Sequence, residues 1–448
     1  MRRLRIVPGR PLRGRVRVPG DLLLGQQALV WAALGEGASL ISGLSSRPDH
    51  LLLCDALRAM GVPVAHTDAG VRVMGGGLRG LRMPAGALQA GASATTLELL
   101  TALLSGQHFG TRVEAAGAAL THSLRTLIAP LRARGAHVAG KSTDDGDVRA
   151  PVAVAPLIAG EHLAEAEIEI PDGDHVTKLG LLLSGLYVPG TTAIAEGMLS
   201  IDHAERALMA LGAGIHTQGA LTLLDRGERQ GSWPGFEWHI PGDFSLACWL
   251  LAAALAVPGS DVTLEGVGLN RTRSAFLEVL RHAGAPIEVT PKGDTAGDEP
   301  VADLRVRSGR LRSAHVVGEL AVRISQDAPA LLALAPCLGG KITVRDLASL
   351  RARVPDPLRA PAQLLRENGF ECTSFADGFD LQPSDARAAS VVHAANLSPE
   401  CLLLACVLSL SAQAETRIDH AETLDALYPG LGDTLARLGA DVAWEELT

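Results

Sequence analysis

The segment VPGDLLLGQQALVWAALGEGAS, from Val18 to Ser39, is repeated later in the chain as IPGDFSLACWLLAAALAVPGSD, from Ile240 to Asp261. Each copy begins with a Pro-Gly-Asp turn, and aspartate is a residue type that caps the first turn of a helix. Apolar residues at helical spacing follow in both copies. The repeat therefore predicts a chain built from two similar halves, each opening on a capped, apolar helix.

A shorter repeat divides each half into three. Six helical segments end in the pattern Leu-x-x-x-Gly, whose glycine is expected to cap the helix in the left-handed conformation. These glycines are Gly61, Gly135, Gly212, Gly284, Gly369 and Gly439. A β-branched or alternating run precedes each helix, and a second strand-like run follows each glycine. The period predicts six strand–helix–strand units and hence an α/β protein rather than a helical solenoid.

The longer repeat groups these six units into two α/β domains. We expect the first domain over residues 21–240 and the second over residues 241–448, with residues 1–20 contributing a strand to the second. Two like domains that face each other form a cleft, which is a favoured place for a small-molecule site. The first Pro-Gly-Asp turn lies where the chain passes between the domains, so its neighbours are expected to lie near that cleft.

Composition excludes several classes of protein. The 448 residues are 47% hydrophobic and 20% charged, which excludes a disordered or fibrous chain. A net charge of −9 and the lack of a basic cluster argue against nucleic-acid binding. The longest apolar run, Cys248 to Val257, is much shorter than a membrane span of about 20 residues. The first residues lack the apolar run of a signal peptide, and six cysteines without a C-x-x-C pair suit a reducing cytoplasm, where we expect this protein.

Cysteine and histidine spacing favours neither disulfides nor metal binding. The six cysteines form no C-x-x-C pair, and most lie in apolar helical runs, which predicts buried free thiols. No grouping of His, Cys and carboxylates has the spacing of a metal site. We therefore expect no metal and no cofactor. The expected partner is a small molecule in the cleft, and a protein partner is left open.

Several motifs carry a resemblance to a known family over essentially the full length of the chain. They are the two Pro-Gly-Asp segments, LLLSGLYVPGTT at 181–192, SIDHAERAL at 200–208 and LYPGLGDTLARLGADV at 427–442. The sequence resembles the 5-enolpyruvylshikimate-3-phosphate (EPSP) synthases and, more distantly, the UDP-N-acetylglucosamine enolpyruvyl transferases. The resemblance implies two inside-out α/β domains of three βαβαββ units each. It also implies transfer of the enolpyruvyl group of phosphoenolpyruvate to a hydroxyl of shikimate-3-phosphate.

The resemblance assigns substrate-binding cations to positions that hold other residue types in this chain. The family pattern P-G-D-K-S, whose Lys reaches phosphoenolpyruvate, reads Pro-Gly-Asp-Leu-Leu at 19–23, and the Arg that follows it is Gln27. The loop G-N-S-G-T-T-x-R, which lays its backbone against phosphoenolpyruvate, contains Ser93 and Thr95. Its final Arg is replaced by Glu98. The first half thus lacks three of the family's cations at these positions.

Further motifs of the family also depart from its pattern. The Arg of S-L-x-x-R-P-M falls on Ser123, and the acceptor-binding turn S-A-Q begins Asp174-His175. The segment I-D-E-x-P, whose Asp accepts the hydroxyl proton in the family, has Gln326 at that position. Asp327 is its neighbour, but a shift of one residue in an extended chain turns a side chain to the other face.

The last motifs retain one arginine and lose most of the other charges. The signature L-R-x-K-E-S-D-R keeps Arg351, and Arg353 keeps a positive charge where the family has Lys. The acid of that signature is Val354, and its final Arg is Pro357. The Lys of K-S-F-P is Ala426, and the D-H-R helix start falls near residues 396–401, which hold neither His nor Arg.

A few polar residues remain as candidates for substrate binding, each with a structural alternative. The candidates are Gln27, Ser93, Thr95, Asp174, His175, Lys178, Arg351 and Arg353. The hydroxyls of Ser93 and Thr95 are suited to cap a helix, and the two arginines equally suit a solvated loop or an interdomain ion pair. Lys178 is expected at the cleft or in solvent. His203 is expected to be a helix-start residue rather than a catalytic one.

Three functions stay open from the sequence. Phosphate and carboxylate leave water only for charge-assisted bonds of equal quality, and Leu22, Leu23 and Glu98 supply none. The leading hypothesis is a catalytically silent or strongly impaired member of the family, retained for binding or assembly. The second is an active carboxyvinyl transferase of the shikimate pathway with rearranged residues. The third is a cleft that binds a less charged small molecule against the apolar wall of Leu22 to Leu24.

Overall fold

The computed structural model describes residues 2–144, 146–225, 232–351, 356–384, 391–393 and 397–446. The chain divides into two compact units, here named unit 1 and unit 2. Unit 1 comprises Met1–Pro19, Pro241–Gly293 and Pro300–Thr448, and unit 2 comprises Gly20–Ile240 and Asp294–Glu299. Both Pro-Gly-Asp turns therefore lie where the chain passes from one unit to the other.

One sheet topology recurs throughout the described residues. The strands form six sheets of four strands, three sheets in each unit. In every sheet one edge strand pairs parallel with its neighbour, and that neighbour pairs antiparallel with the third strand. A parallel pair needs a crossover connection, and in four of the sheets that connection contains one or more helices. In the other two sheets the parallel partners come from distant parts of the chain, Glu237–His239 with Glu36–Ser42 and Asp261–Gly268 with Arg13–Val16. The predicted six-unit α/β organisation is confirmed.

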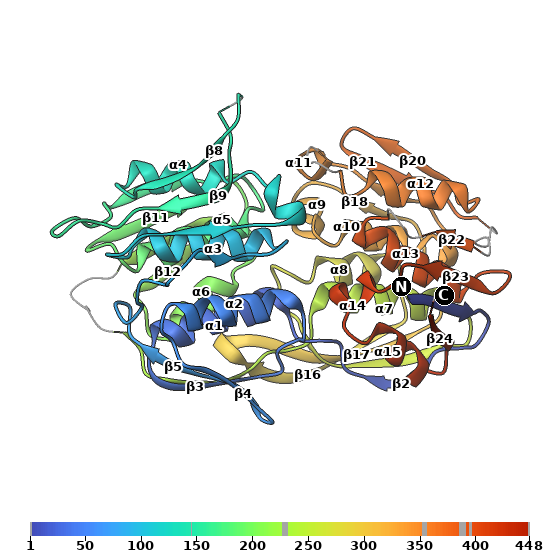
Figure 1. Cartoon of the computed structure of the whole chain (residues 1–448). Helices are drawn as coiled ribbons and strands as arrows, with labels where there is room; N and C mark the ends of the chain where they lie inside the picture. Colours follow the sequence, from blue (N-terminus) through green and yellow to red (C-terminus); the bar gives the residue numbers. More distant parts are fainter. Residues whose placement is uncertain are drawn as a thin grey trace. The chain divides into compact units, whose positions relative to one another are not determined.

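Unit 2 contains three of these sheets and seven helical segments among its residues up to Ile240 (Figure 1). In spatial order, its sheets are β14-β3-β5-β4 (Glu237–His239, Glu36–Ser42, Gly70–Gly76, Val64–Thr67), β6-β7-β9-β8 (Leu88–Gln89, Thr111–Glu114, Val148–Val154, Val138–Ser142) and β10-β11-β13-β12 (Ala166–Glu169, Thr191–Ala195, Leu221–Asp225, Ile215–Gln218). Its helices are α1 (Leu22–Leu34), α2 (Pro48–Ala59), α3 (Ala94–Ser105), the 3-10 helix η1 (Gly117–Leu120), α4 (Arg125–Ala133), α5 (His175–Gly185) and α6 (His203–Ala210).

Unit 1 repeats the arrangement, with strands from the N-terminal segment completing two of its sheets. In spatial order, the sheets are β16-β17-β15-β2 (Ile287–Thr295, Glu299–Arg307, Asp261–Gly268, Arg13–Val16), β18-β19-β21-β20 (Ala314–Val316, Ile342–Val344, Gly378–Leu381, Cys372–Phe375) and β22-β23-β1-β24 (Val391–His393, Thr416–Asp419, Arg2–Val7, Asp441–Glu446). The short 3-10 helix η2 (Ala296–Asp298) joins β16 to β17. The other helices are α7 (Phe244–Ala256), α8 (Ala275–His282), α9 (Glu319–Ile324), α10 (Ala328–Leu332), the 3-10 helix η3 (Ala335–Cys337), α11 (Ala348–Arg351), α12 (Arg359–Glu367), α13 (Pro399–Leu410), α14 (Thr423–Leu427) and α15 (Leu431–Arg437).

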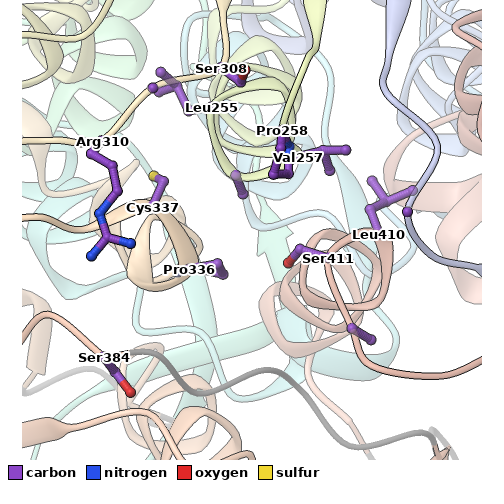
Figure 2. Close-up of a pocket in the computed structure, with 14 residues that line it drawn as sticks. Leu255, Val257, Pro258, Ser308, Arg310, Pro336, Cys337, Ser384, Leu410 and Ser411 are labelled. Atoms are coloured by element: carbon purple, nitrogen blue, oxygen red, sulfur yellow. The ribbon is translucent and has the colours of Figure 1, made fainter.

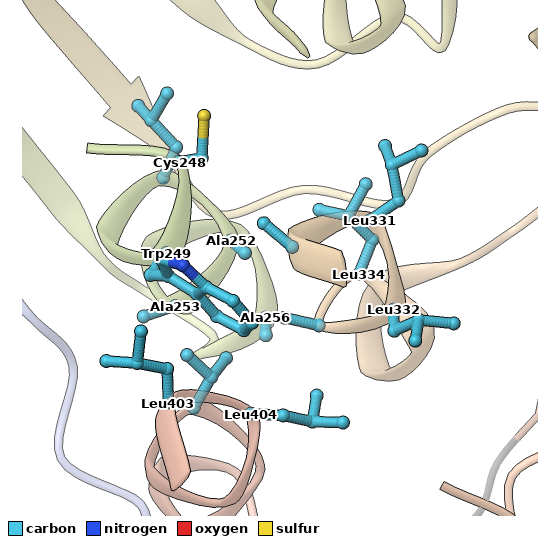
Figure 3. Close-up of a cluster of buried hydrophobic side chains, with 14 of the residues drawn as sticks. Cys248, Trp249, Ala252, Ala253, Ala256, Leu331, Leu332, Leu334, Leu403 and Leu404 are labelled. Carbon is cyan, nitrogen blue, oxygen red and sulfur yellow. The ribbon is translucent and has the colours of Figure 1, made fainter. Parts of the chain in front are cut away.

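The core of each unit is made of helices that present no polar face to solvent. In unit 2 these are α1, α3 and α5, with α3 packed beside α5, and in unit 1 they are α7, α10 and α13. Figure 3 shows Trp249 and Ala253 of α7 facing Leu403 of α13, while Leu331 of α10 lies at the upper right of the view. A helix without a polar face must be buried on every side, so the sheets lie outside and the helices inside. No helix in the described part of the chain is long and apolar enough to cross a membrane.

The predicted helix ends are confirmed. All six capping glycines have positive φ, between 75° and 96°. At the start of α1, the Leu24 N–H donates to the Asp21 carboxylate at 2.9 Å, and at the start of α7 the Ser245 N–H donates to Asp243 at 2.8 Å. The two copies of the opening segment therefore form the same turn and the same cap.

Gly212 allows a test of the capping rule without a packing effect. Its φ is +78°, and a Cβ added there would meet no atom within 4 Å. Gly212→Ala is therefore expected to lower the stability of unit 2 by about 1 kcal/mol, through backbone strain alone. Gly212→Asn should lower it less, because asparagine tolerates this conformation better.

The measurement is the shift of the thermal and urea midpoints of the full chain. Gly86→Ala is the matched control, because Gly86 also has open space around it but no positive φ. Equal midpoints for the Gly212→Ala and Gly86→Ala proteins would contradict the argument.

Candidate functional site

Three helix N-termini of unit 2 hold candidate residues. Asp21, Ser93 and Asp174 precede α1, α3 and α5, and each side chain accepts a hydrogen bond from a backbone N–H of its own helix. The Ser93 hydroxyl accepts from the Thr96 N–H at 3.2 Å, and Asp174 accepts from the Thr177 N–H at 3.3 Å. Ser93 and Asp174 therefore act as helix caps. For Ser93 this is the structural alternative that the sequence suggests.

Glu98 is buried in α3 and paired with a histidine. Its side chain is 6% exposed, and its Oε1 lies 2.6 Å from Nε2 of His122. The Thr177 hydroxyl donates to the other carboxylate oxygen at 3.4 Å. Burial raises the pKa of Glu98 above its ordinary value, and the hydrogen bond and charge of His122 oppose that rise only in part. A local acid–imidazole pair thus occupies the place where the family resemblance expects an arginine.

His122 is a residue that the sequence analysis missed. The family arginine was assigned to Ser123, whose hydroxyl instead donates to the carboxylate of Asp147. The neighbouring His122 is the residue that reaches Glu98. One signal was available in the sequence, because His122 is the only ionisable side chain between Glu114 and Arg125.

The remaining candidates on α1 and α3, Gln27 and Thr95, are buried or half-buried in unit 2. Gln27 is 2% exposed, so it is part of the interior of unit 2. The neighbouring Gln26 amide donates to the Thr96 hydroxyl at 2.7 Å, which joins α1 to α3. Thr95 is half-buried in the first turn of α3, and Leu22 is half-buried at the start of α1.

Lys178 faces neither solvent nor an open surface. Its side chain is 1% exposed, and its Nζ lies 2.9 Å from Glu196 and 2.7 Å from Glu205. Burial by itself would lower the pKa of Lys178, but the two carboxylates outweigh burial and raise it. Burial raises the pKa of Glu205, which the charge of Lys178 opposes. Lys178 is therefore the cation of an interior ion cluster.

Two histidines have local partners inside unit 2. The ring of His175 is buried, and its Nδ1 lies 3.1 Å from the carbonyl oxygen of Gly173. His203 is the first residue of α6, as predicted, and its Nδ1 lies 2.7 Å from Oε1 of Glu299. Both members of the His203–Glu299 pair are buried.

In unit 1, Asp327 belongs to a buried ion pair. Nη1 of Arg273 lies 2.6 Å from Asp327, and both side chains are less than a tenth exposed. The Ser245 hydroxyl, on the first turn of α7, also donates to Asp327. Gln326, at the position of the family's proton acceptor, is half-buried beside it. Asp327 thus faces Arg273 and α7, and its oxygens are engaged there.

Arg351 lies in an ion pair, and Arg353 lies outside the described residues. Nη2 of Arg351 is 2.9 Å from Asp356, and its Nη1 donates to the Gly378 carbonyl at 3.2 Å. All these partners belong to unit 1. Val354 also lies outside the described residues.

A family profile and several relatives match nearly the whole chain. The family profile "EPSP synthase (3-phosphoshikimate 1-carboxyvinyltransferase)" matches residues 6–435. The chain belongs to the EPSP synthase family. A 3-phosphoshikimate 1-carboxyvinyltransferase of Synechococcus sp. (strain RCC307) is 38% identical over 442 residues, which cover 96% of this chain and 98% of the relative. One of Geobacter sp. (strain M21) is 32% identical over 432 residues, covering 96% and 97%.

Solved structures of the family share the fold. An EPSP synthase of Acinetobacter baumannii superposes with a TM-score of 0.87 at 27% identity, with 100% of both chains covered. The enolpyruvyl transferase NikO of Streptomyces tendae gives a TM-score of 0.72 at 17% identity, covering 100% of this chain and 99% of that one. The second likeness shows the fold alone. The predicted two-domain enolpyruvyl transferase fold is confirmed.

The raised pKa of Glu98 in this EPSP synthase family member predicts a pH-dependent penalty on folding. At pH 4 the carboxyl is largely protonated in the folded and the unfolded chain, so the penalty is small. As the pH rises, the unfolded chain loses the proton first, and the folded chain is destabilised relative to it. Glu98→Gln cannot ionise, so its melting temperature relative to wild type is expected to be higher at pH 7 than at pH 4.

Differential scanning calorimetry at pH 4, 5.5 and 7 measures this difference. Glu371→Gln serves as the control, because the side chain of Glu371 is exposed and its removal should shift the midpoint equally at each pH. A Glu98→Gln difference that falls as the pH rises would refute the burial argument.

Proposed function

We propose that this member of the EPSP synthase family is catalytically silent or strongly impaired, and that it is retained for binding or assembly. The observation that carries the proposal is the pairing of the buried Glu98 with the half-buried His122. The resemblance expects a phosphoenolpyruvate-binding arginine at Glu98. With Glu98 ionised, the pair is neutral overall when His122 is protonated and negatively charged when it is not, so it lacks the net positive charge that the arginine would supply to an anion.

The binding free energy lost with three cationic side chains is larger than the free energy that helix N-termini contribute to anion binding. Each charge-assisted hydrogen bond to a phosphate or carboxylate contributes about 1.5–3 kcal/mol. Leu22, Gln27 and Glu98 replace three side chains that would make such bonds. The N-terminus of a helix contributes only about 0.3–1 kcal/mol toward an anion, so α1, α3 and α5 cannot compensate for three lost cations. The loss corresponds to a weakening of phosphoenolpyruvate binding by at least about a thousandfold.

The proton acceptor is also lacking. Gln326 has an amide where the family has the Asp that takes the hydroxyl proton, and an amide is not a base at neutral pH. Asp327 does not substitute for it, because Arg273 and Ser245 already engage both of its oxygens. Loss of the cations and of the base together supports a silent member more strongly than either loss alone.

Two alternatives each have an observation in their favour. An active carboxyvinyl transferase is favoured by the relatives of that name, which match nearly the whole chain at up to 38% identity among those given above. A less charged ligand is favoured by the half-buried Leu22 and Leu23, which would offer it an apolar surface. The following measurements separate these alternatives from the proposal.

A phosphate-release assay with phosphoenolpyruvate and shikimate-3-phosphate tests activity directly. The expected result is no turnover above the enzyme-free background, with an active family member as the positive control. Calorimetry should likewise show no saturable binding of phosphoenolpyruvate in the millimolar range, with or without shikimate-3-phosphate. Turnover at a rate comparable to the positive control would overturn the proposal.

Restoring the family residues tests whether their loss is the cause. The full set is Leu22→Lys, Leu23→Ser, Gln27→Arg, Glu98→Arg, Gln326→Asp, Val354→Glu, Pro357→Arg and Ala426→Lys. Catalytic groups that act as a unit are not additive, so the full set should regain phosphoenolpyruvate binding and no single change should do so. Glu98→Arg alone should even destabilise unit 2, because a second cation would then face His122 in a buried place.

The readouts are calorimetric binding of phosphoenolpyruvate and the same phosphate-release assay. A single reversion that restored activity by itself would show that the other positions are not the cause. A folded full-set variant that still binds no phosphoenolpyruvate would show that the scaffold, rather than these side chains, has diverged.

A further inference from the structure

A cavity of about 570 Å³ lies wholly within unit 1, at the C-terminal ends of α7 and α13 and beside η3 (Figure 2). Its volume is within the range of pockets that hold small molecules, about 300–1,000 Å³. Its wall combines apolar side chains with one guanidinium, one thiol and three serine hydroxyls among the described lining residues. None of those lining residues is a position that the family resemblance assigns to substrate.

The corresponding place in unit 2 is filled by aromatic side chains. Trp233 donates from its indole N–H to the carbonyl of Trp31 in α1 at 3.0 Å. Tyr187 follows α5, and its ring packs so closely on Gly106, at the end of α3, that a Cβ there would lie 2.3 Å from the ring. The guanidinium of Arg79 lies 5.0 Å from the centre of the Tyr187 ring and donates to the Gly106 carbonyl. Two rings and one arginine therefore cover these helix ends.

The same three places in unit 1 line the cavity. The correspondence follows from sheet order, in which β2 and β17 of unit 1 match β14 and β5 of unit 2. Trp233 lies four residues before β14, and Gly9 lies four residues before β2. Tyr187 lies two residues after α5, and Ala412 lies two residues after α13.

Unit 1 has an arginine at the place that matches Arg79, but no aromatic residue at the places that match Trp233 and Tyr187. Arg79 lies three residues after β5, and Arg310 lies three residues after β17. Gly9 and Ala412, which replace the tryptophan and the tyrosine, both line the cavity with Arg310. In unit 1 the cavity thus occupies the space that two aromatic side chains fill in unit 2. Arg310 lies at this cavity without the aromatic ring that Arg79 contacts in unit 2.

Arg310 has no ion-pair or hydrogen-bond partner within the described part of the chain. Figure 2 shows it beside Cys337, with Leu410 and Ser411 across the cavity. Burial raises the pKa of the Cys337 thiol to about 12, and the charge of Arg310 opposes that rise. The thiol is therefore a neutral part of the wall, and the exposed guanidinium of Arg310 is the cationic group at the cavity, where it can donate charge-assisted hydrogen bonds to an anion.

Ser308 also lines the cavity, and its hydroxyl oxygen accepts the Gly259 N–H at 2.9 Å. In Figure 2 the Arg310 guanidinium points away from Ser308, so the arginine is the group that would bind an anion. A guanidinium suits a carboxylate, to which it can donate two parallel hydrogen bonds. Leu255, Val257 and Leu410 supply an apolar wall for the rest of a ligand.

We propose that this cavity of unit 1 binds a small aromatic carboxylate, whose ring occupies the space that Trp233 and Tyr187 fill in unit 2 and whose carboxylate bonds to Arg310. The site lies within one unit and goes beyond the proposed function, on which it does not depend. An aromatic ring is favoured over an aliphatic body because the matching place in unit 2 holds rings, one of them beside an arginine.

Calorimetric titration of the full chain with 3-phenylpropanoate tests the site, in the absence of phosphoenolpyruvate and shikimate-3-phosphate. The expected result is saturable binding with a Kd of about 1 mM or tighter. The uncharged 3-phenylpropanol and the non-aromatic 3-cyclohexylpropanoate should each bind at least about fivefold more weakly, because one lacks the carboxylate and the other lacks the ring.

Three variants locate the binding. Arg310→Gln should weaken the binding of 3-phenylpropanoate at least about tenfold. Ala412→Tyr should abolish it by restoring the ring found in unit 2. Arg312→Gln is the matched control, because Arg312 is exposed in the same segment but does not line the cavity, and its Kd should equal that of the wild type.

Each contrary outcome counts against the proposal. Absence of saturable binding overturns it, and so does binding that Arg310→Gln leaves unchanged. Equal affinities for the acid and the alcohol would also overturn it. If Ala412→Tyr fails to fold, the comparison of Arg310→Gln with Arg312→Gln still decides the outcome, and neither result alters the test of the proposed function.

Discussion

The burial of apolar helices inside a shell of sheets is the constraint on which the rest of this structure depends. Helices such as α1 and α7 have no polar face, so every side of them must be covered by the same unit. Their first N–H groups then lie in a dry environment and need acceptors from the chain itself. Asp21, Ser93 and Asp243 provide them. The loops keep a ligand-binding appearance because the fold needs their caps, whether or not the chemistry survives.

The same constraint explains why charged residues alone are a poor guide to a site in this chain. Lys178 and Arg273 are both nearly fully buried and both paired with carboxylates. A buried cation that lost its partners would strongly destabilise the fold, so such clusters persist independently of catalysis. Residues that carry out only substrate binding are under no such requirement. In this EPSP synthase family member the interior pairs belong to the scaffold, whereas Leu22 and Gln27 stand where the resemblance expects substrate-binding cations.

The internal repeat also provides a comparison within one chain. Equivalent helix ends are covered by Trp233 and Tyr187 in unit 2 and are open beside Gly9 and Ala412 in unit 1. Because the sheet order of the two units is the same, the difference lies in the side chains and not in the topology. Such a difference is invisible to a family comparison that aligns each unit only with its counterpart in other proteins.

The sequence by itself determined the six α/β units, their capping glycines and the two capped opening helices, because helical period and glycine position are local properties of the chain. It also determined the family, whose motifs run along the whole length. Only the tertiary structure decided that His122 meets Glu98, that Lys178 is an interior cation, and that Asp327 faces Arg273. These pairings join residues tens of positions apart, and the free energy of a buried charge depends on which partner the fold brings to it.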